Sequence, residues 1–137
     1  MIMNKSNRRK FIGTAAAIAV GTAASAMPLS TEKGKYPVVH HVFFWLKNPD
    51  SKTDREELIK GVKTLSKIET VLDLHVGIVA GTEKRDVIDS SWGVSELLFF
   101  KDLEGQAIYQ THPIHLEFIK NYSHLWAKVL VYDILEA

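Results

Sequence analysis

The stretch Val38-Val39-His40-His41-Val42-Phe43-Phe44-Trp45-Leu46 consists largely of β-branched and aromatic residues, the composition of a β-strand. Side chains alternate between the two faces of a strand, so Val42, Phe44 and Leu46 share one face while Phe43 and Trp45 share the other. Neither face carries a run of polar residues. The sequence therefore predicts a strand that needs burial on both sides.

The rest of the chain alternates helix and strand patterns around this strand. The predicted elements are an amphipathic helix over residues 54–69 with a Thr53/Glu56 capping box, a strand over 71–80, a polar loop over 81–91, a strand over 92–100, helices over 102–109 and 113–125, and a strand over 128–135. The order strand, helix, strand, strand, helix, strand predicts an α+β, ferredoxin-like fold. In this fold a four-stranded antiparallel sheet carries its helices on one face.

The sheet face that no helix is expected to cover carries large apolar groups, Phe43 and Trp45 among them. An apolar patch of this size is rarely left in water. A second copy of the chain, packed sheet against sheet about a two-fold axis, would cover the patch. The sequence thus predicts a homodimer through the sheet face, closed into a dimeric α+β barrel.

The first 26 residues have the pattern of an export signal. Arg8 and Arg9 precede an apolar, Ala-rich run, and Ala24-Ser25-Ala26 fits the small-x-small rule for cleavage before Met27. The paired arginines resemble the twin-arginine signature, which predicts a periplasmic protein. An uncleaved anchor is the alternative, but the run is short for a span of about 20 strongly apolar residues. No stable membrane insertion is expected after cleavage.

Three segments follow from this pattern: a signal over residues 1–26, a Pro- and Gly-containing linker over 27–36, and one domain over 37–137. Four basic residues fall in the signal. Removing them from 17 leaves 13 basic against 16 acidic residues, so the remaining chain carries about −3. A mildly acidic domain is poorly suited to a phosphate backbone, and no nucleic-acid partner is expected. The absence of cysteine from the sequence excludes disulfides and thiolate ligands.

Two of the six histidines stand three residues apart in Tyr109-Gln110-Thr111-His112-Pro113-Ile114-His115. Proline suits the first position of a helix, which puts His115 at the third position and His112 just before the helix. The positive helix end disfavours imidazolium, so His115 is expected to be neutral and able to act as a base. Tyr109 could then hydrogen-bond a substrate carbonyl or enolate oxygen. The alternative is structural: His112 caps the helix, His115 satisfies a carbonyl and Tyr109 packs.

A metal site made of His112, His115 and His40 is a further alternative. It is not favoured, because His112 precedes a proline and the nearest carboxylate, Glu117, lies on another face of the helix. No metal and no cofactor are therefore expected. Glu96 lies among apolar residues of the predicted third strand. If buried, it must be paired or protonated; at a sheet edge it would contact water, and we favour the edge.

Three segments resemble the stress-responsive A/B-barrel family of the dimeric α+β barrel superfamily, over about residues 38–136. They are the strand from His40 to Lys47, the Tyr-x-x-His-Pro-x-His signature at 109–115, and the strand from Trp126 to Asp133. The resemblance implies a homodimer with a small apolar cavity between sheet and helices in each protomer. Most members have no established chemistry, and a few resemble cofactor-free cyclases that use a His base and a Tyr partner in aldol condensation.

Carried over to this sequence, the resemblance implies His115 as the base and Tyr109 as its partner. The ligand-binding residues expected from the strand and the signature are His40, Val42, Phe44, Tyr109, His112, His115 and Trp126. The resulting prediction is an exported homodimer that binds a small, mostly apolar molecule without catalysis. A cofactor-free lyase or cyclase is the alternative. A haem- or oxygen-dependent monooxygenase is a second alternative by superfamily analogy, so whether the chain is an enzyme stays open.

Overall fold

The computed structural model describes residues 34–137; the predicted signal, 1–26, and residues 27–33 of the predicted linker lie outside the described residues. No helix in the described part of the chain is long and apolar enough to cross a membrane. The elements are β3 (Val38–Leu46), α3 (Lys52–Lys63), the 3-10 helix η2 (Thr64–Lys67), β4 (Asp73–Gly77), β5 (Val94–Phe100), α4 (Leu103–Thr111), α5 (Pro113–Tyr122), the 3-10 helix η3 (Ser123–Leu125) and β6 (Trp126–Leu135).

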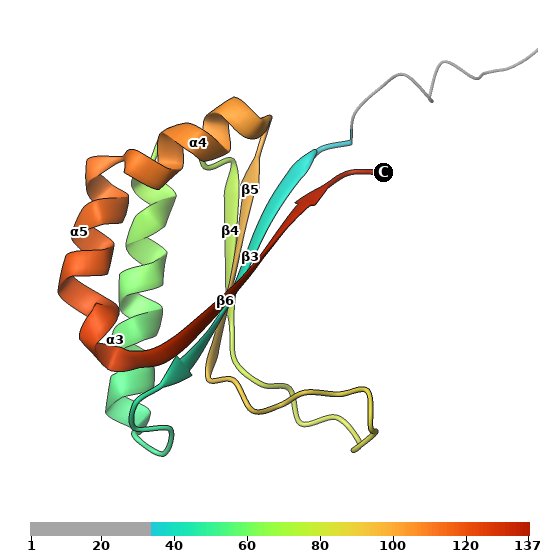
Figure 1. The fold of residues 1–137 in the computed structure, drawn as a ribbon, viewed down its shortest axis with the longest axis vertical. Helices are drawn as coiled ribbons and strands as arrows, with labels where there is room; N and C mark the ends of the chain where they lie inside the picture. The colour runs from blue at the N-terminus through green and yellow to red at the C-terminus, as the bar shows by residue number, and fades with distance from the viewer. Residues whose placement is uncertain (1–33) are drawn as a thin grey trace, which may run out of the picture. The chain divides into compact units, whose positions relative to one another are not determined.

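The four strands form one sheet in the order β4-β5-β3-β6, with every neighbouring pair antiparallel. The three α-helices lie on one side of this sheet (Figure 1). Strand β3 and strand β5 are therefore interior strands, while β4 and β6 form the edges. The predicted α+β, ferredoxin-like fold with helices on one face is confirmed.

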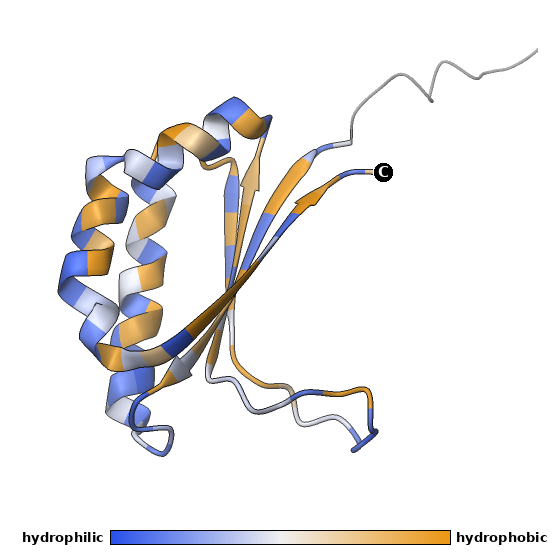
Figure 2. Ribbon diagram, viewed as in Figure 1, coloured by the Kyte–Doolittle hydropathy of each residue, from blue (hydrophilic) through white to orange (hydrophobic). Residues whose placement is uncertain are grey.

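The core lies between the sheet and the helices. Along β3 the burial alternates strictly, and the buried face, from Val38 to Leu46, points toward the helices. Leu58 and Val62 of α3 and Phe118 of α5 cover this face. Figure 2 shows the apolar residues on the strands and on the helix faces turned toward them. The alternation agrees with the pattern expected from the sequence of this strand.

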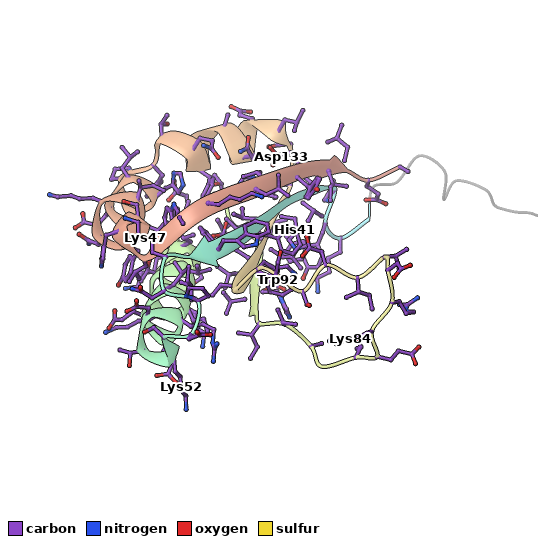
Figure 3. The ribbon with its side chains drawn as sticks, turned by 60° about the horizontal axis from the view of Figure 1, so that its bottom comes forward. His41, Lys47, Lys52, Lys84, Trp92 and Asp133 are labelled. Carbon is purple, nitrogen blue, oxygen red and sulfur yellow. The ribbon has the colours of Figure 1, made fainter. Side chains whose placement is uncertain are left out.

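The opposite face of the sheet has no helix over it. Phe43 of β3 packs against the rings of His41, Trp92 and Tyr132, with centroid distances of 4.3, 5.2 and 6.4 Å. Figure 3 shows His41 and Trp92 on this side, near the long loop that carries Lys84. Apart from the buried Ser95, its strand residues are half-buried to exposed. Most are apolar, including Val39, Phe43, Trp45, Leu97, Phe99, Leu130, Tyr132 and Ile134.

Several boundaries differ from those predicted. Helix α3 begins earlier because Ser51, rather than Thr53, is the N-cap; its hydroxyl accepts from the Asp54 amide at 3.1 Å. Strand β4 covers only 73–77 of the predicted 71–80, because its pairing with β5 runs from Asp73 opposite Phe99 to Gly77 opposite Ser95 and goes no further. On α5 the buried residue is Phe118, whereas Leu116 is 54% exposed.

Candidate functional site

A cavity of about 220 Å³ lies between the helix-facing side of the sheet and helices α4 and α5. Its lining residues are His40, Val42, Phe44, Glu96, Tyr109, Gln110, His115, Phe118, Ile119, Trp126, Val129 and Val131. Six of the seven residues predicted from the sequence to bind ligand are among them, and only His112 is not. A larger hollow of about 480 Å³ lies in the loop between β4 and β5, but mainly exposed loop residues line it.

His115 stands at the third position of α5, as expected, and is half-buried. Its Nδ1 lies 2.9 Å from the backbone oxygen of Gln110. A carbonyl oxygen can only accept, so Nδ1 carries the proton and Nε2 keeps a free lone pair. Burial lowers the pKa of His115, and the nearby His40 lowers it further, against the opposing effect of the Gln110 hydrogen bond. The ring is therefore neutral at neutral pH and can accept a proton.

Tyr109 lies in the last turn of α4 and is 1% exposed. Its ring centroid is 4.4 Å from that of His115 and 5.4 Å from that of His40. Burial raises the pKa of Tyr109, and the negative charges of Glu96 and Asp133 raise it further. The phenol thus stays protonated and serves as a hydrogen-bond donor at any ordinary pH.

His40 is buried on β3, and its Nδ1 pairs with Oδ1 of Asp133 on the neighbouring strand β6 at 2.5 Å. The two residues face each other directly in the strand register. A carboxylate accepts the Nδ1 proton and fixes the orientation of the ring, which leaves Nε2 for other partners. Sequence reasoning placed His40 in the site but did not identify Asp133 as its partner. Figure 3 labels Asp133 on β6.

Glu96 is the second residue that the sequence-based site lacked. It is 1% exposed, on the interior strand β5, and lines the cavity. The expectation that it contacts water at a sheet edge is wrong, because β3 and β4 flank β5 on both sides. Burial raises the pKa of Glu96 to about 8, and its Oε2 has no hydrogen-bond partner in the described part of the chain. The predicted fold could have shown that Glu96 is buried, because the third strand of a ferredoxin-like sheet is an interior strand.

His112 lies outside the cavity. Its Nδ1 accepts the Ile114 amide at 3.1 Å and so caps α5, while Nε2 lies 3.1 Å from Oε1 of Glu69. Since Nδ1 accepts, Nε2 carries the proton and donates it to Glu69. Both nitrogens are thereby occupied. Among residues 34–137 no group of three His, Cys, Asp or Glu side chains could hold a metal ion.

The arrangement combines aromatic walls with a few converging polar groups. Phe44 packs against Trp126 at 4.9 Å and Phe118 against Trp126 at 5.6 Å, measured between ring centroids. The free Nε2 of His115 is a potential base, and the Tyr109 hydroxyl is a donor. An apolar cavity with a small number of oriented polar groups is the usual form of a small-molecule site. The base and the donor together suit two tasks. They can bind a small molecule that carries oxygen on a carbon atom, or they can transfer a proton at that carbon centre.

Comparison with known proteins identifies the family of this fold. A family model described as stress responsive A/B barrel domain matches residues 38–135. A protein of Arabidopsis thaliana with a known crystal structure is 28% identical, with a TM-score of 0.63 over 74% of this chain and 96% of its own. No curated protein matches the sequence.

Two further solved structures share the fold at lower identity. A dimeric protein of unknown function from Bacteroides fragilis, with a ferredoxin-like fold, is 19% identical, with a TM-score of 0.57 over 72% of this chain and 95% of its own. A hydroxynitrile lyase from Passiflora edulis is 20% identical, with a TM-score of 0.61 over 73% of this chain and 93% of its own. At these identities the likeness shows the fold.

Proposed function

The chain belongs to the stress-responsive A/B barrel domain family, and on that premise we propose that it binds a small, mostly apolar molecule in the cavity beneath α4 and α5. The observation that supports this proposal most strongly is the cavity itself. Its walls are mostly aromatic and aliphatic, and among residues 34–137 no hydrogen bond engages Nε2 of His115. A polar atom that is free to bond and lies in a mostly apolar cavity is the kind of group that orients a small ligand.

The size of the cavity limits the ligand. A volume of about 220 Å³ lies below the roughly 300–1,000 Å³ of sites for drug-sized molecules. The ligand is therefore about the size of a single substituted ring. A haem is much larger than this volume, so the cavity does not fit the haem-dependent alternative. A haem titration followed by absorbance tests that alternative, and a Soret shift would support it.

We include homodimerisation in the proposal. The helix-free face of the sheet exposes mostly apolar side chains, and β6 adds partly exposed Leu130, Tyr132 and Ile134 at its edge. Apolar surface of this extent favours a protein partner. A second copy packed about a two-fold axis presents the same apolar face. The fold relative from Bacteroides fragilis is described as dimeric, which supports this choice.

Export to the periplasm is also part of the proposal and rests on the sequence of residues 1–26. Arg8→Lys together with Arg9→Lys should retain the protein in the cytoplasm if the twin-arginine pathway carries it. Cell fractionation with an antibody to the domain measures this. Unchanged export of the double variant would contradict the assignment of the pathway.

Fluorescence of Trp126 gives a direct test of binding. The sequence has three tryptophans, and only Trp126 lines the cavity, so Trp45→Phe combined with Trp92→Phe leaves one reporter at the site. Small aromatic compounds should quench this reporter with saturation. The matched control adds Val42→Phe, which places a ring in the cavity and should abolish quenching while circular dichroism stays unchanged. Equal quenching in the filled variant would contradict binding at this site.

A second candidate function is a cofactor-free lyase or cyclase. It is favoured by one observation: the neutral His115 and the protonated Tyr109 lie side by side, 4.4 Å between ring centroids, in one cavity. His115 would act as general base through Nε2, and Tyr109 would orient the carbonyl. The fold relative that is a hydroxynitrile lyase supports a test with a hydroxynitrile.

Mandelonitrile cleavage, followed by the absorbance of the benzaldehyde formed, separates the two candidates. If the protein is an enzyme of this kind, His115→Ala should reduce turnover by two or more orders of magnitude with folding intact. If it only binds, no turnover above the buffer rate is expected, and His115→Ala should change ligand affinity moderately. Turnover that survives in His115→Ala would contradict the role of this residue.

A further inference from the structure

We propose that Glu96 is a ligand-binding residue whose protonated side chain donates a hydrogen bond to a carbonyl oxygen, so that the cavity selects small neutral carbonyl compounds. This inference rests on the proposed function, because it names the class of molecule that the same cavity binds. It adds a residue that the family resemblance did not supply.

The first argument is the position of Glu96 in the sheet. In the strand register Glu96 lies opposite Val42 of β3 and Val76 of β4, on the helix-facing side. It is 1% exposed, lines the cavity, and its Oε2 is without a hydrogen-bond partner among residues 34–137. A buried polar atom of this kind costs stability unless something meets it. The cavity that it lines is open space in which a ligand could meet it.

The second argument is the charge of the surroundings. The titratable groups that face Glu96 are His40 from β3, Tyr109 from α4 and His115 from α5, while β4 offers Val76 and α3 contributes no lining residue. Of the described residues that line the cavity, none is Lys or Arg. His40 is already paired with Asp133, whose carboxylate offsets any charge on the ring. No cation therefore compensates an ionised Glu96.

The protonation state follows from this environment. Because burial disfavours the carboxylate, the pKa of Glu96 rises to about 8. At neutral pH the side chain is a carboxylic acid with one O–H to donate. Tyr109 lines the same cavity and supplies a second donor there. Two donors match the two lone pairs of a carbonyl oxygen.

A cationic amine is the competing ligand class, since Phe44, Phe118 and Trp126 could surround a cation. It is disfavoured because the amine would have to lose its hydration and also drive the proton from Glu96. The two classes predict opposite pH dependences. Binding of a carbonyl compound weakens as Glu96 ionises, whereas binding of a cation strengthens. This difference determines the choice of test compounds.

The test uses acetophenone, the hydrocarbon α-methylstyrene, which has the same shape without the oxygen, and benzylamine as the cation. Dissociation constants are measured by quenching of Trp126 in the Trp45→Phe/Trp92→Phe background, from pH 7 to pH 10. At pH 7 acetophenone should bind about tenfold more tightly than α-methylstyrene, the value of one hydrogen bond. Above pH 8 this preference should fall severalfold, because the Glu96 donor is lost and only the Tyr109 donor remains. His115 and Tyr109 keep their protonation states across this range.

Variants test whether Glu96 causes the preference for acetophenone and its pH dependence. Glu96→Gln keeps an N–H donor without a titrating charge, so it should keep the preference and lose the pH dependence. Glu96→Leu should show a reduced preference and no pH dependence. Glu104→Gln, an exposed residue of α4, should behave as the parent protein. Equal binding of acetophenone and α-methylstyrene at pH 7, or benzylamine binding that strengthens through pH 8, would overturn the inference.

A ligand-free measurement separates failure of this inference from failure of the proposed function. In carboxyl-¹³C NMR, one glutamate resonance that is missing in Glu96→Gln should titrate near pH 8. A midpoint for that resonance in the ordinary range of about 4 would overturn the inference even if compounds bind. If neither acetophenone nor α-methylstyrene quenches Trp126, the proposed binding function fails, and the inference fails with it.

Discussion

Glu96→Gln is expected to stabilise the protein at alkaline pH and to leave its stability unchanged at acid pH. Burial raises the pKa of Glu96 from an ordinary 4.5 to about 8 in the folded protein. Below 4.5 both the folded and the unfolded chain hold the proton. Between 4.5 and 8 only the folded protein holds it, and the free energy of unfolding falls as pH rises. Above 8 neither state is protonated, and the loss is complete.

The size of the effect follows from the width of this window. Each pH unit corresponds to about 1.4 kcal/mol, so the whole window corresponds to about 5 kcal/mol. Glutamine has no charge in either state. The difference in unfolding free energy between Glu96→Gln and the parent protein should therefore grow from near zero at pH 4.5 to about 5 kcal/mol at pH 8.

Urea denaturation at a series of pH values measures this difference. Protein concentration is held constant, because unfolding of a dimer depends on it. The control is Glu83→Gln, an exposed loop residue, which should show no pH-dependent difference from the parent protein. Parallel curves for Glu96→Gln and the parent protein would refute the reasoning, since they would mean that Glu96 is ionised and solvated when folded.

Three further outcomes follow from the packing. Ser51→Ala should lower the free energy of unfolding by about 1 kcal/mol through loss of the helix cap, whereas Thr53→Ala should change it by a few tenths of a kcal/mol. Thermal denaturation measures both, and equal effects would mean that the cap assignment is wrong. Phe118→Ala should lower the free energy of unfolding by about 3–5 kcal/mol, whereas Leu116→Ala, at an exposed position, should lower it by less than about 0.5 kcal/mol. Similar losses for the two variants in urea denaturation would contradict the orientation of α5. Phe43→Asp should yield monomers in sedimentation, while Leu116→Asp should not, and a dimer in both variants would exclude the sheet face as the interface.

The fold was predictable because its strands have unambiguous patterns. Strand β3 was predicted with its observed bounds, 38–46, since an uninterrupted β-branched and aromatic run ends at the Asn48–Asp50 turn. The edge strand β4 was predicted too long, because its apolar pattern continues to Ala80 while its pairing with β5 ends at Gly77 opposite Ser95. The residue pattern shows that a segment favours the strand conformation. Pairing with the neighbouring strand decides how long the strand is.

Local alternatives of similar strength explain the other differences. Ser51 and Thr53 are both good caps, each followed three residues later by an acidic residue, and the turn in which the Ser51 amide bonds Asn48 at 3.0 Å selects the earlier one. Helix α5 has apolar residues at too many positions for a unique stripe. Only packing against Phe44 and Trp126 shows that Phe118 is the inward residue.

The site residues that belong to a short sequence motif could be predicted. Those that strand pairing brings to the site could not. His115 and Tyr109 came from a short local signature, and the structure places both at the cavity. Asp133 and Glu96 reach the site through strand pairing, with His40 opposite Asp133 and Val42 opposite Glu96. The apolar neighbours of Glu96 marked it as unusual but did not place it in the site, and nothing near Asp133 in the sequence indicated that it pairs with His40. Long-range register of this kind is fixed by the whole sheet.

Native mass spectrometry of the protein purified from its own cells tests the central claim most directly, because it reports oligomeric state and retained ligand together. The account predicts a dimer at micromolar concentration that carries a small molecule in the cavity. In the matched pair of variants, Val42→Phe should give a dimer without that molecule, and Val87→Phe, altered at an 82% exposed loop position, should keep it. A monomer, or a dimer whose bound molecule survives in Val42→Phe, would contradict the account.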